Sequence, residues 1–398
     1  MKLLEPIVAW HHDISKIRRD IHAHPELAFE EFRTADVVAA KLEEWGIEIH
    51  RGLGGTGVVG IIRGNQPGDR AVGLRADMDA LPMQEANTFA HASKNDGKMH
   101  ACGHDGHTAM LLAAAQYLSQ HRDYAGIVYV IFQPAEEGGG GAKRMIDDGL
   151  FTRFPMEAVF GMHNWPGMKP GQFGLTPGPI MASSNEFSIT VKGKGTHAGM
   201  PNLGVDPVMA AVQLAQSLQT IITRNRNPLD AAVLSITQIH AGSADNVVPN
   251  HAELRGTVRT FTLDVLDLIE RRMEEISRHT CAAMDCEVEF KFQRNYPPTI
   301  NHPEEAEFCA GVLRDIVGEA NVNAKVQPTM GAEDFAFMLQ ELPGCYVWIG
   351  NGTGDHRDSG HGLGPCMLHN GSYDFNDELL PLGGTYWVQL ALKRLAKA

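Results

Sequence analysis

Apolar residues in the first half of the chain recur with two different spacings. Repeats three and four residues apart predict helices over 5–22 and 30–45, within 107–121, and over 139–149. Short runs rich in β-branched residues predict strands at 57–63, 71–75, 127–132 and 158–162. Alternation of this kind indicates an α/β sheet with helices on its faces.

The pattern changes near Pro177–Ala182. From there, strand, helix, strand, strand, helix and strand are predicted at 186–192, 206–224, 231–240, 252–261, 264–280 and 286–292. This order is that of a ferredoxin-like α+β unit. It ends at Tyr296-Pro297-Pro298, after which the α/β pattern resumes with predicted elements at 303–318, 333–341, 345–350 and 379–396. The chain is therefore predicted to form a discontinuous α/β domain from residues 1–181 and 294–398, with a second domain inserted at 182–293.

Composition and charge narrow the class of protein. The chain has 398 residues, of which 43% are hydrophobic and 21% are charged, as in ordinary globular proteins. Its formal net charge of -14 disfavours nucleic acid as a partner. No apolar stretch approaches the length of about 18 residues that a membrane span needs. Six cysteines are too sparse for a disulfide framework, and the first residues do not resemble a signal peptide, so a cytoplasmic location is expected.

Two glycine-rich segments resemble nucleotide-binding loops and are rejected. The segment Gly55–Gly60 fits G-x-G-x-x-G, but it runs into a predicted strand and not into the helix that this fingerprint requires. The segment Gly138–Gly141 precedes Lys143 but lacks the Gly-Lys-Ser/Thr of a phosphate-binding loop.

The segment Met99–Thr108 concentrates metal-binding side chains just before a predicted helix. It contains Cys102 and three histidines, and Cys102 and His104 are two positions apart. In an extended loop such residues point the same way and can meet one metal ion. Thiolate and imidazole suit zinc, cobalt, nickel and similar ions. A buried cysteine beside surface histidines is the alternative interpretation.

Further candidates follow the predicted strands. Glu136 and Glu137 come after the strand at 127–132, where α/β folds place their sites. Adjacent side chains diverge, so one carboxylate can bind metal while the other takes a proton from water. His163 ends the strand at 158–162, and His369 lies near the last helix. Each alone is more often structural, but together they form a plausible two-metal ligand set: Cys102, His104, Glu137, His163 and His369.

The chain resembles one known family through motifs in the family's order along essentially its whole length. They are LRADMDALP, MHACGHDGHT, QPAEEGGGGA, GMHNWP, GKGTHAGMP, NVVPN, GAEDFA and LHNGSYDFND. The family is the hippurate hydrolase and plant auxin-conjugate hydrolase branch of the aminoacylase and glutamate-carboxypeptidase metallopeptidases. The resemblance implies a mixed catalytic sheet flanked by helices and an inserted lid and dimerisation domain.

The resemblance also implies roles in the catalytic domain. Cys102, His104, Glu137, His163 and His369 match metal ligands, and Glu136 matches the general base. Asp77 matches a carboxylate that supports a metal-bound histidine in many relatives. Arg75 stands where those relatives have that histidine, so Asp77 is expected to act outside the ligand set. His369 is followed by Asn370-Gly371, where Asn-Pro was expected.

In the inserted domain, His197 matches a histidine that contacts the substrate carbonyl. In dimeric relatives this histidine reaches across the interface, which implies a homodimer. Asn246 and Arg259 match positions that reach the substrate carboxylate, although an exposed strand cation is the alternative for Arg259.

The implied activity is hydrolysis of N-acyl amino acids, such as N-benzoyl or N-acetyl derivatives, to a carboxylic acid and a free amino acid. Two divalent ions per subunit are implied, whether Mn, Zn, Co or Ni. Three alternatives remain open at this point. They are a dipeptidase or carboxypeptidase, a deacetylase of an N-acetylated intermediate, and a metal-dependent binding protein without catalysis.

Overall fold

The computed structural model describes residues 1–357 and 359–396. The chain divides into two compact units. The first unit comprises Met1–Ile180, Ile300–Gln327 and the chain from Asp334 onward, and the second comprises Met181–Thr299 and Pro328–Glu333.

The first unit is built on one mixed sheet of eight strands in the order β1-β2-β4-β3-β5-β16-β6-β15. β3, β4, β5 and β16 run parallel to one another, and β1 and β2 run antiparallel to their neighbours in the order. β6 runs antiparallel to β16 but parallel to β15. The bounds are β1 Glu48–Leu53, β2 Gly57–Arg63, β3 Gln66–Asp77, β4 Ala125–Gln133, β5 Ala158–Pro166, β6 Phe173–Gly174, β15 Val322–Asn323 and β16 Gly344–Gly352. The predicted mixed α/β sheet is thus confirmed.

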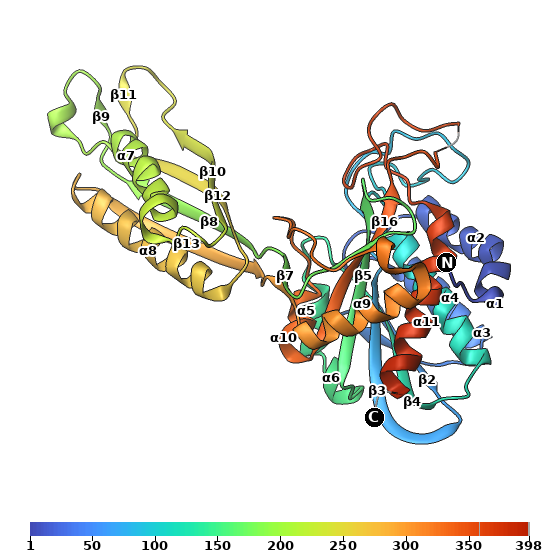
Figure 1. The fold of residues 1–398 in the computed structure, drawn as a ribbon. Helices are drawn as coiled ribbons and strands as arrows, with labels where there is room; N and C mark the ends of the chain where they lie inside the picture. The colour runs from blue at the N-terminus through green and yellow to red at the C-terminus, as the bar shows by residue number, and fades with distance from the viewer. Residues whose placement is uncertain (358, 397–398) are drawn as a thin grey trace. The chain divides into compact units, whose positions relative to one another are not determined.

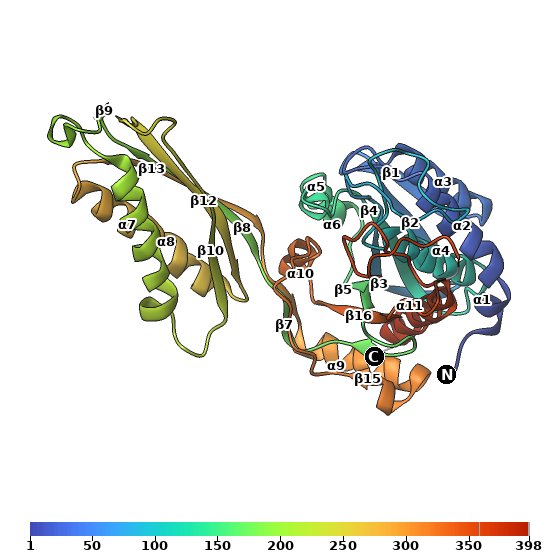
Figure 2. The same cartoon turned by 90° about the horizontal axis from the view of Figure 1, so that it is seen from above.

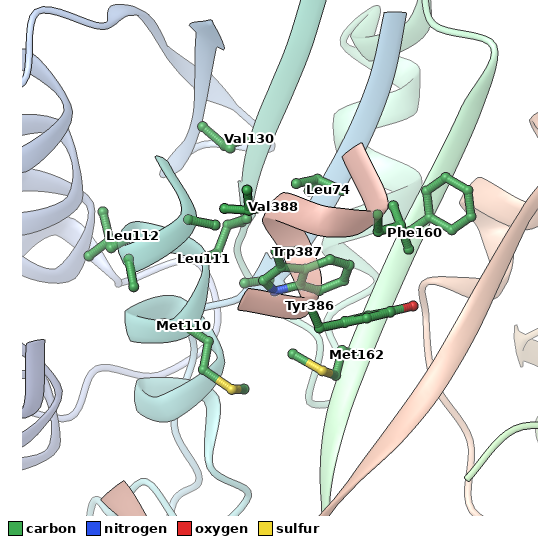
Figure 3. Close-up of a cluster of buried hydrophobic side chains, with 14 of the residues drawn as sticks. Leu74, Met110, Leu111, Leu112, Val130, Phe160, Met162, Tyr386, Trp387 and Val388 are labelled. Atoms are coloured by element: carbon green, nitrogen blue, oxygen red, sulfur yellow. The ribbon is translucent and has the colours of Figure 1, made fainter. Parts of the chain in front are cut away.

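Helices cover both faces of this sheet (Figures 1 and 2). On one face lie α1 Glu5–Ala9, α2 His11–Ala23, α3 Phe32–Glu44, α4 His104–Gln120, α9 Pro303–Val317 and α11 Leu380–Ala396. On the other lie α5 Gly141–Asp147, α6 Leu150–Arg153 and α10 Ala336–Glu341. Figure 3 shows α4 and α11 packed on the central strands through buried side chains that include Met110, Trp387, Leu74, Val130 and Phe160.

The second unit pairs a four-stranded antiparallel sheet with two helices on one of its faces (Figure 2). The strand order is β10-β12-β8-β13, which is the ferredoxin-like order expected from the alternation of elements. The bounds are β8 Ser184–Lys192, α7 Pro207–Thr220, β10 Ala232–Ala241, β12 His251–Thr260, α8 Leu263–Ala282 and β13 Glu287–Tyr296. Short elements complete the chain: β7 Gly178–Met181, β9 Thr196–His197, β11 Val247–Val248 and β14 Thr299–Asn301, with 3-10 or π turns at Pro201–Leu203, Ile221–Asn225, Glu319–Asn321 and Asp377–Leu379.

Several elements differ from the sequence-based expectation. The helix expected over 5–22 is interrupted at Trp10, which lies between α1 and α2. The strand expected at 158–162 continues to Pro166, so His163 lies within β5 and not at its end. β1 was not predicted because its polar residues alternate poorly, as suits the edge strand that it forms. Among the described residues, no helix combines the length and the low charge that crossing a membrane requires.

Candidate metal centre

The candidate site lies where the parallel strands of the first unit end. Asp77 is the last residue of β3, Glu136 and Glu137 follow β4, and His163 lies in the last half of β5. His104 is the first residue of α4. Because the carboxyl ends of parallel strands share one edge of a sheet, elements far apart in sequence deliver these side chains to one place.

The turn between Cys102 and His104 differs from the extended loop that the sequence suggested. Gly103 is left-handed, with φ 91°, and α4 begins at once with His104. A Cβ on Gly103 would lie 2.3 Å from Nδ2 of Asn164, so only glycine fits this position without a rearrangement. The turn, and not an extended backbone, brings the thiol and the imidazole together.

All five sequence-predicted ligands are brought together in two groups that share Cys102. One contains Cys102, His104 and His163, and the other contains Cys102, Glu137 and His369. Within each group the candidate ligand atoms all lie within 4.8 Å of one another. Sγ of Cys102 is 3.3 Å from Nε2 of His163, and Oε1 of Glu137 is 3.1 Å from Nε2 of His369. Two groups around one shared thiol match the requirement of a two-metal centre.

The inner histidines direct Nε2 toward this cluster because Nδ1 is already engaged. Nδ1 of His163 donates a hydrogen bond to the backbone oxygen of Asn164 at 2.6 Å. Nδ1 of His104 donates to Oδ1 of Asp79 at 3.1 Å. Such partners orient metal-binding histidines. Nε2 of His104 is buried and has no hydrogen-bond partner among the described residues. A bound cation would supply the missing partner, so these residues fit a metal.

The charges around the cluster also favour a cation. Burial raises the pKa of the Cys102 thiol well above its ordinary value, and Glu137, Glu136 and Asp77 add to this effect. Burial alone would lower the pKa of His104, but Asp77, Asp79 and Glu137 outweigh it and raise the pKa to about 10. Both groups therefore hold protons at neutral pH, and a divalent cation would displace those protons on binding.

Asp77 takes a different partner from the one its motif suggested. It accepts hydrogen bonds from Nδ1 of His107 at 2.6 Å and from Nη1 of Arg75 at 2.7 Å. Nε2 of His107 in turn accepts the backbone N–H of Asn164 at 2.9 Å. Both ring nitrogens of His107 are thus engaged, and His107 has no lone pair left for a metal. Asp79, and not Asp77, holds Nδ1 of His104.

The loop after β4 gives its two carboxylates different surroundings. Glu136 is 6% exposed, and its Oε2 lies 4.0 Å from Nε2 of His104. Contacts with His369 and His104 lower the pKa of Glu137 even though burial opposes this. The backbone N–H of Glu137 donates to Oδ2 of Asp79 at 2.9 Å. Asp79 therefore holds both the loop and His104.

His369 approaches the cluster from the segment before α11. Its side chain is 54% exposed, unlike the inner ligands, and its backbone is left-handed with φ 59°. Its N–H donates to the backbone oxygen of Ala101 at 2.8 Å, which ties it to the segment that carries Cys102. A left-handed residue with a Cβ is unfavourable by itself and is often found at functional sites.

The second unit carries the three predicted substrate-binding residues. His197 and Asn246 line one cavity of about 850 Å³, and the backbone N–H of Ala198 donates to the backbone oxygen of Asn246 at 3.0 Å. Arg259 lines a different cavity of about 930 Å³ on the sheet, so the structure does not bring it together with the other two within this unit. Nδ1 of His197 accepts the N–H of Gly199 at 3.0 Å, which leaves Nε2–H as a donor in the neutral ring.

Asp79 and His107 were missed by sequence reasoning. Both lie inside motifs that were singled out, but the sequence offers no sign that Asp79, and not Asp77, accepts the hydrogen bond from Nδ1 of His104. The repeated aspartate in Arg75-Ala76-Asp77-Met78-Asp79 was the one available signal. On a strand, residues two apart face the same side, so both carboxylates were candidates.

Comparison with known proteins connects this geometry to a family. The family model described as peptidase family M20/M25/M40 matches residues 73–392. The chain is 41% identical over 396 residues to the hippurate hydrolase of Campylobacter jejuni, covering 99% of this chain and 100% of that protein. It is 38% identical over 387 residues to an N-acetylcysteine deacetylase of Bacillus subtilis, covering 96% and 97%. A crystal structure of a dinuclear metal-binding M20 peptidase from Bacillus subtilis superposes with a TM-score of 0.84 at 34% identity, covering 98% of this chain and 99% of that one.

Proposed function

The chain belongs to peptidase family M20/M25/M40 and is a metal-dependent amidohydrolase, and from this premise we propose that it cleaves N-acyl amino acids. The products would be a carboxylic acid and a free amino acid. The observation that carries the proposal is the pair of three-residue groups that share Cys102. A catalytically silent binding protein would have no use for the additional buried carboxylate of Glu136 beside them.

The proposed cofactor is two divalent ions per chain. Cys102, His104 and His163 would hold one ion, and Cys102, Glu137 and His369 would hold the other. When bound, such ions lower the pKa of a nearby water toward neutrality and polarise the carbonyl of the amide. Thiolate and imidazole donors suit Zn, Co or Ni, whereas the carboxylate of Glu137 also suits Mn, so the donor set alone does not choose among these metals.

The side chains would move the protons of the reaction. Glu136 would take a proton from the attacking water as its oxygen bonds to the amide carbon. Nε2–H of His197 would donate to the carbonyl oxygen as negative charge develops there. Glu136 would then deliver its proton to the amide nitrogen, which leaves as the amine of the free amino acid. The proton count balances because one carboxylate serves as base and then as acid.

The amino-acid half of the substrate would be recognised by polar groups of the second unit. Asn246 and Arg259 are proposed to bind the α-carboxylate. The names of two relatives favour different acyl groups, benzoyl for the hippurate hydrolase and acetyl for the deacetylase. A dipeptidase would need the same ligands and the same base, so the metal centre does not separate it from an acyl-amino-acid hydrolase.

Turnover assays test the proposal directly. Protein reconstituted with Mn, Co, Zn or Ni is assayed against hippurate, N-acetyl amino acids, auxin conjugates and dipeptides. We expect N-acyl amino acids to be cleaved with a higher kcat/KM than dipeptides. Chelation should abolish the activity, and addition of metal should restore it. A preference for dipeptides would overturn the substrate class, and full turnover by demetallated protein would overturn the metal chemistry.

A further inference from the structure

A buried carboxylate outside the metal cluster contacts the loop that carries Glu136. Glu31 is the N-terminal flanking residue of α3 and is fully buried. Its Oε1 accepts the backbone N–H of Ala135 at 2.8 Å and that of Phe29 at 3.0 Å. Its Oε2 accepts the hydroxyl of Thr56 at 2.5 Å. One side chain therefore joins the start of α3, the turn before β2 and the loop after β4.

Ala135 occupies an unfavourable backbone conformation directly before Glu136. Its φ is 54°, in the left-handed region that residues with a Cβ rarely adopt. Contacts with the glycines of the same loop restrict the backbone of Ala135. A Cβ on Gly139 would lie 2.7 Å from Cβ of Ala135, and the N–H of Gly141 donates to the backbone oxygen of Ala135 at 3.0 Å. The conformation of Ala135 sets the direction in which the chain presents Glu136.

We propose that Glu31 is a positioning residue that holds Ala135 in this left-handed conformation and so directs the carboxylate of Glu136 toward the candidate metal centre. The inference rests on the proposed function, because it takes Glu136 as the proton-transferring group. The hydrogen bonds of the Glu31 carboxylate described above are with Ala135, Phe29 and Thr56, so Glu31 acts on Glu136 through the backbone of the loop.

The surroundings of Glu31 suit a hydrogen-bond acceptor more than a charge. Burial raises its pKa to about 7, although the hydrogen bond from Thr56 opposes this, and Asp79 contributes to the rise. A carboxyl group and a carboxamide both present a carbonyl oxygen to two N–H donors. Loss of the acceptor would leave the buried N–H of Ala135 without this partner, which buried backbone groups rarely tolerate.

The chain provides a matched control at the same helix. Glu26 accepts the N–H groups of Arg33 and Thr34, at 3.0 and 2.8 Å, and so stabilises the first turn of α3. The hydrogen bonds of its carboxylate go to Arg33 and Thr34, within α3 itself. Glu26→Ala and Glu31→Ala each remove a carboxylate from the start of α3, but only the second affects Ala135.

Steady-state kinetics of the metal-loaded variants test the proposal. Glu31→Ala should lower kcat by about 100-fold, as expected for a misplaced reacting group, with metal content unchanged and a smaller change in KM. Glu26→Ala should lose stability but keep the kcat of the wild type. Glu31→Gln should keep most of kcat, because its amide oxygen still accepts both N–H groups and its NH₂ can donate to Thr56. Glu31→Asp keeps a carboxylate, but its side chain is too short to reach the N–H of Ala135. This variant should fold even if Glu31→Ala does not, and it should still lower kcat.

A second substitution separates positioning from general destabilisation. Ala135→Gly adopts positive φ without penalty, so adding it to Glu31→Ala should recover kcat about fivefold. Equal losses of kcat in Glu26→Ala and Glu31→Ala at equal folded fraction would overturn the proposal, as would wild-type kcat in both Glu31→Ala and Glu31→Asp. Failure of Ala135→Gly to recover any activity would also overturn it. Glu136→Gln is assayed in parallel: if it keeps full activity, the role of Glu136 is wrong, whereas if it is inactive beside a fully active Glu31→Ala, only the positioning role falls.

Discussion

At the scale of single residues, the adjacent side chains of Glu136 and Glu137 have different surroundings, which suit the proposed roles of proton transfer and metal binding, respectively. Glu137 lies in the group with Cys102 and His369, and its pKa is lowered by contacts with His369 and His104. Glu136 is more deeply buried and faces His104. Asp79 holds the backbone N–H of Glu137, so the loop cannot rotate one carboxylate into the place of the other without losing that bond.

Exchange of each carboxylate for its amide should therefore give different defects. Glu136→Gln should retain metal but lower kcat by about 10²–10⁴, the usual contribution of a general base. Glu137→Gln should lower the metal content, because it removes a negative charge and a candidate ligand atom. Elemental analysis and kcat, measured on the same preparations, check both expectations. The reverse pattern, with metal lost from Glu136→Gln and retained in Glu137→Gln, would refute the assignment.

Sequence reasoning reached the five candidate ligands because each lies in a motif with its own chemical signature. It failed where geometry depends on the tertiary fold. Asp77 and Asp79 are alike in sequence, and only the fold shows that Asp79 contacts His104 while Asp77 pairs with His107 and Arg75. Glu31 carries no local signal at all, because its partners Thr56 and Ala135 are far from it along the chain.

At the scale of elements, strands with continuous apolar runs were predicted well. β2 and β4 are almost entirely buried, so each residue of the run carries the same signal. β1 was missed because an edge strand needs few apolar residues. The turn at Gly103 was also missed, since its left-handed glycine depends on the close approach of Asn164 from β5. Hydrophobic patterns in the sequence predict strands that are buried along their length. Edge strands and turns that depend on contacts between distant segments are not predicted in this way.

Helix α2 is joined to the site by a buried histidine. His22 contacts Oδ2 of Asp105 in α4 through Nδ1 at 2.9 Å and Oε1 of Glu85 through Nε2 at 3.2 Å. Burial alone would lower the pKa of His22, but Asp105 and Glu85 outweigh it and raise the pKa to about 9. The ring is therefore protonated at neutral pH, and it ties α2 to the first turn of α4, where His104 lies.

This raised pKa predicts how the stability of the fold depends on pH. Because the folded pKa exceeds the unfolded value of about 6.5, the protonated ring stabilises the folded state fully below that pH. The contribution then declines as the pH rises through about 9. Urea unfolding of the wild type and of His22→Gln should show a free-energy difference that is largest near pH 6 and shrinks toward about pH 9. Titrations common to both proteins cancel in the difference, and a difference that is constant across this range would contradict the assignment.

At the scale of the whole molecule, the candidate chemistry is divided between the two units. The metal cluster and Glu136 belong to the first, and His197, Asn246 and Arg259 belong to the second. Within the second unit, His197 and Asn246 line one cavity and Arg259 lines another. Within one copy of the second unit, these three side chains therefore do not line a common cavity.

Recognition of the α-carboxylate gives a test of the second unit's role. Asn246 and Arg259 are proposed to bind this group, so conversion of hippurate to its methyl ester should lower kcat/KM. Loss of charge-assisted hydrogen bonds corresponds to about 2–4 kcal/mol in the transition state. The comparison is made with the metal-loaded enzyme, and Arg259→Met should reduce the preference for acid over ester. Equal kcat/KM for acid and ester in the wild type would count against a carboxylate-binding role.

The division of His197 and Arg259 between different cavities raises the question of which chain each side chain serves. A homodimer in which His197 serves the partner's metal centre would use two copies of the second unit at each site, because a two-fold axis makes such an exchange reciprocal. The alternative is that His197 serves its own chain. The two arrangements differ when inactive variants are mixed.

Glu136→Ala and His197→Ala, each almost inactive alone, are dissociated and reassembled at equal ratio. Random pairing makes about half of the dimers mixed. In a mixed dimer with exchanged histidines, one site has both Glu136 and the intact His197, whereas the other site lacks both. About a quarter of the wild-type activity should then return. If His197 acts within its own chain, every site lacks one group and no activity returns, so the absence of recovery, with subunit exchange shown independently by mass, would exclude the shared site.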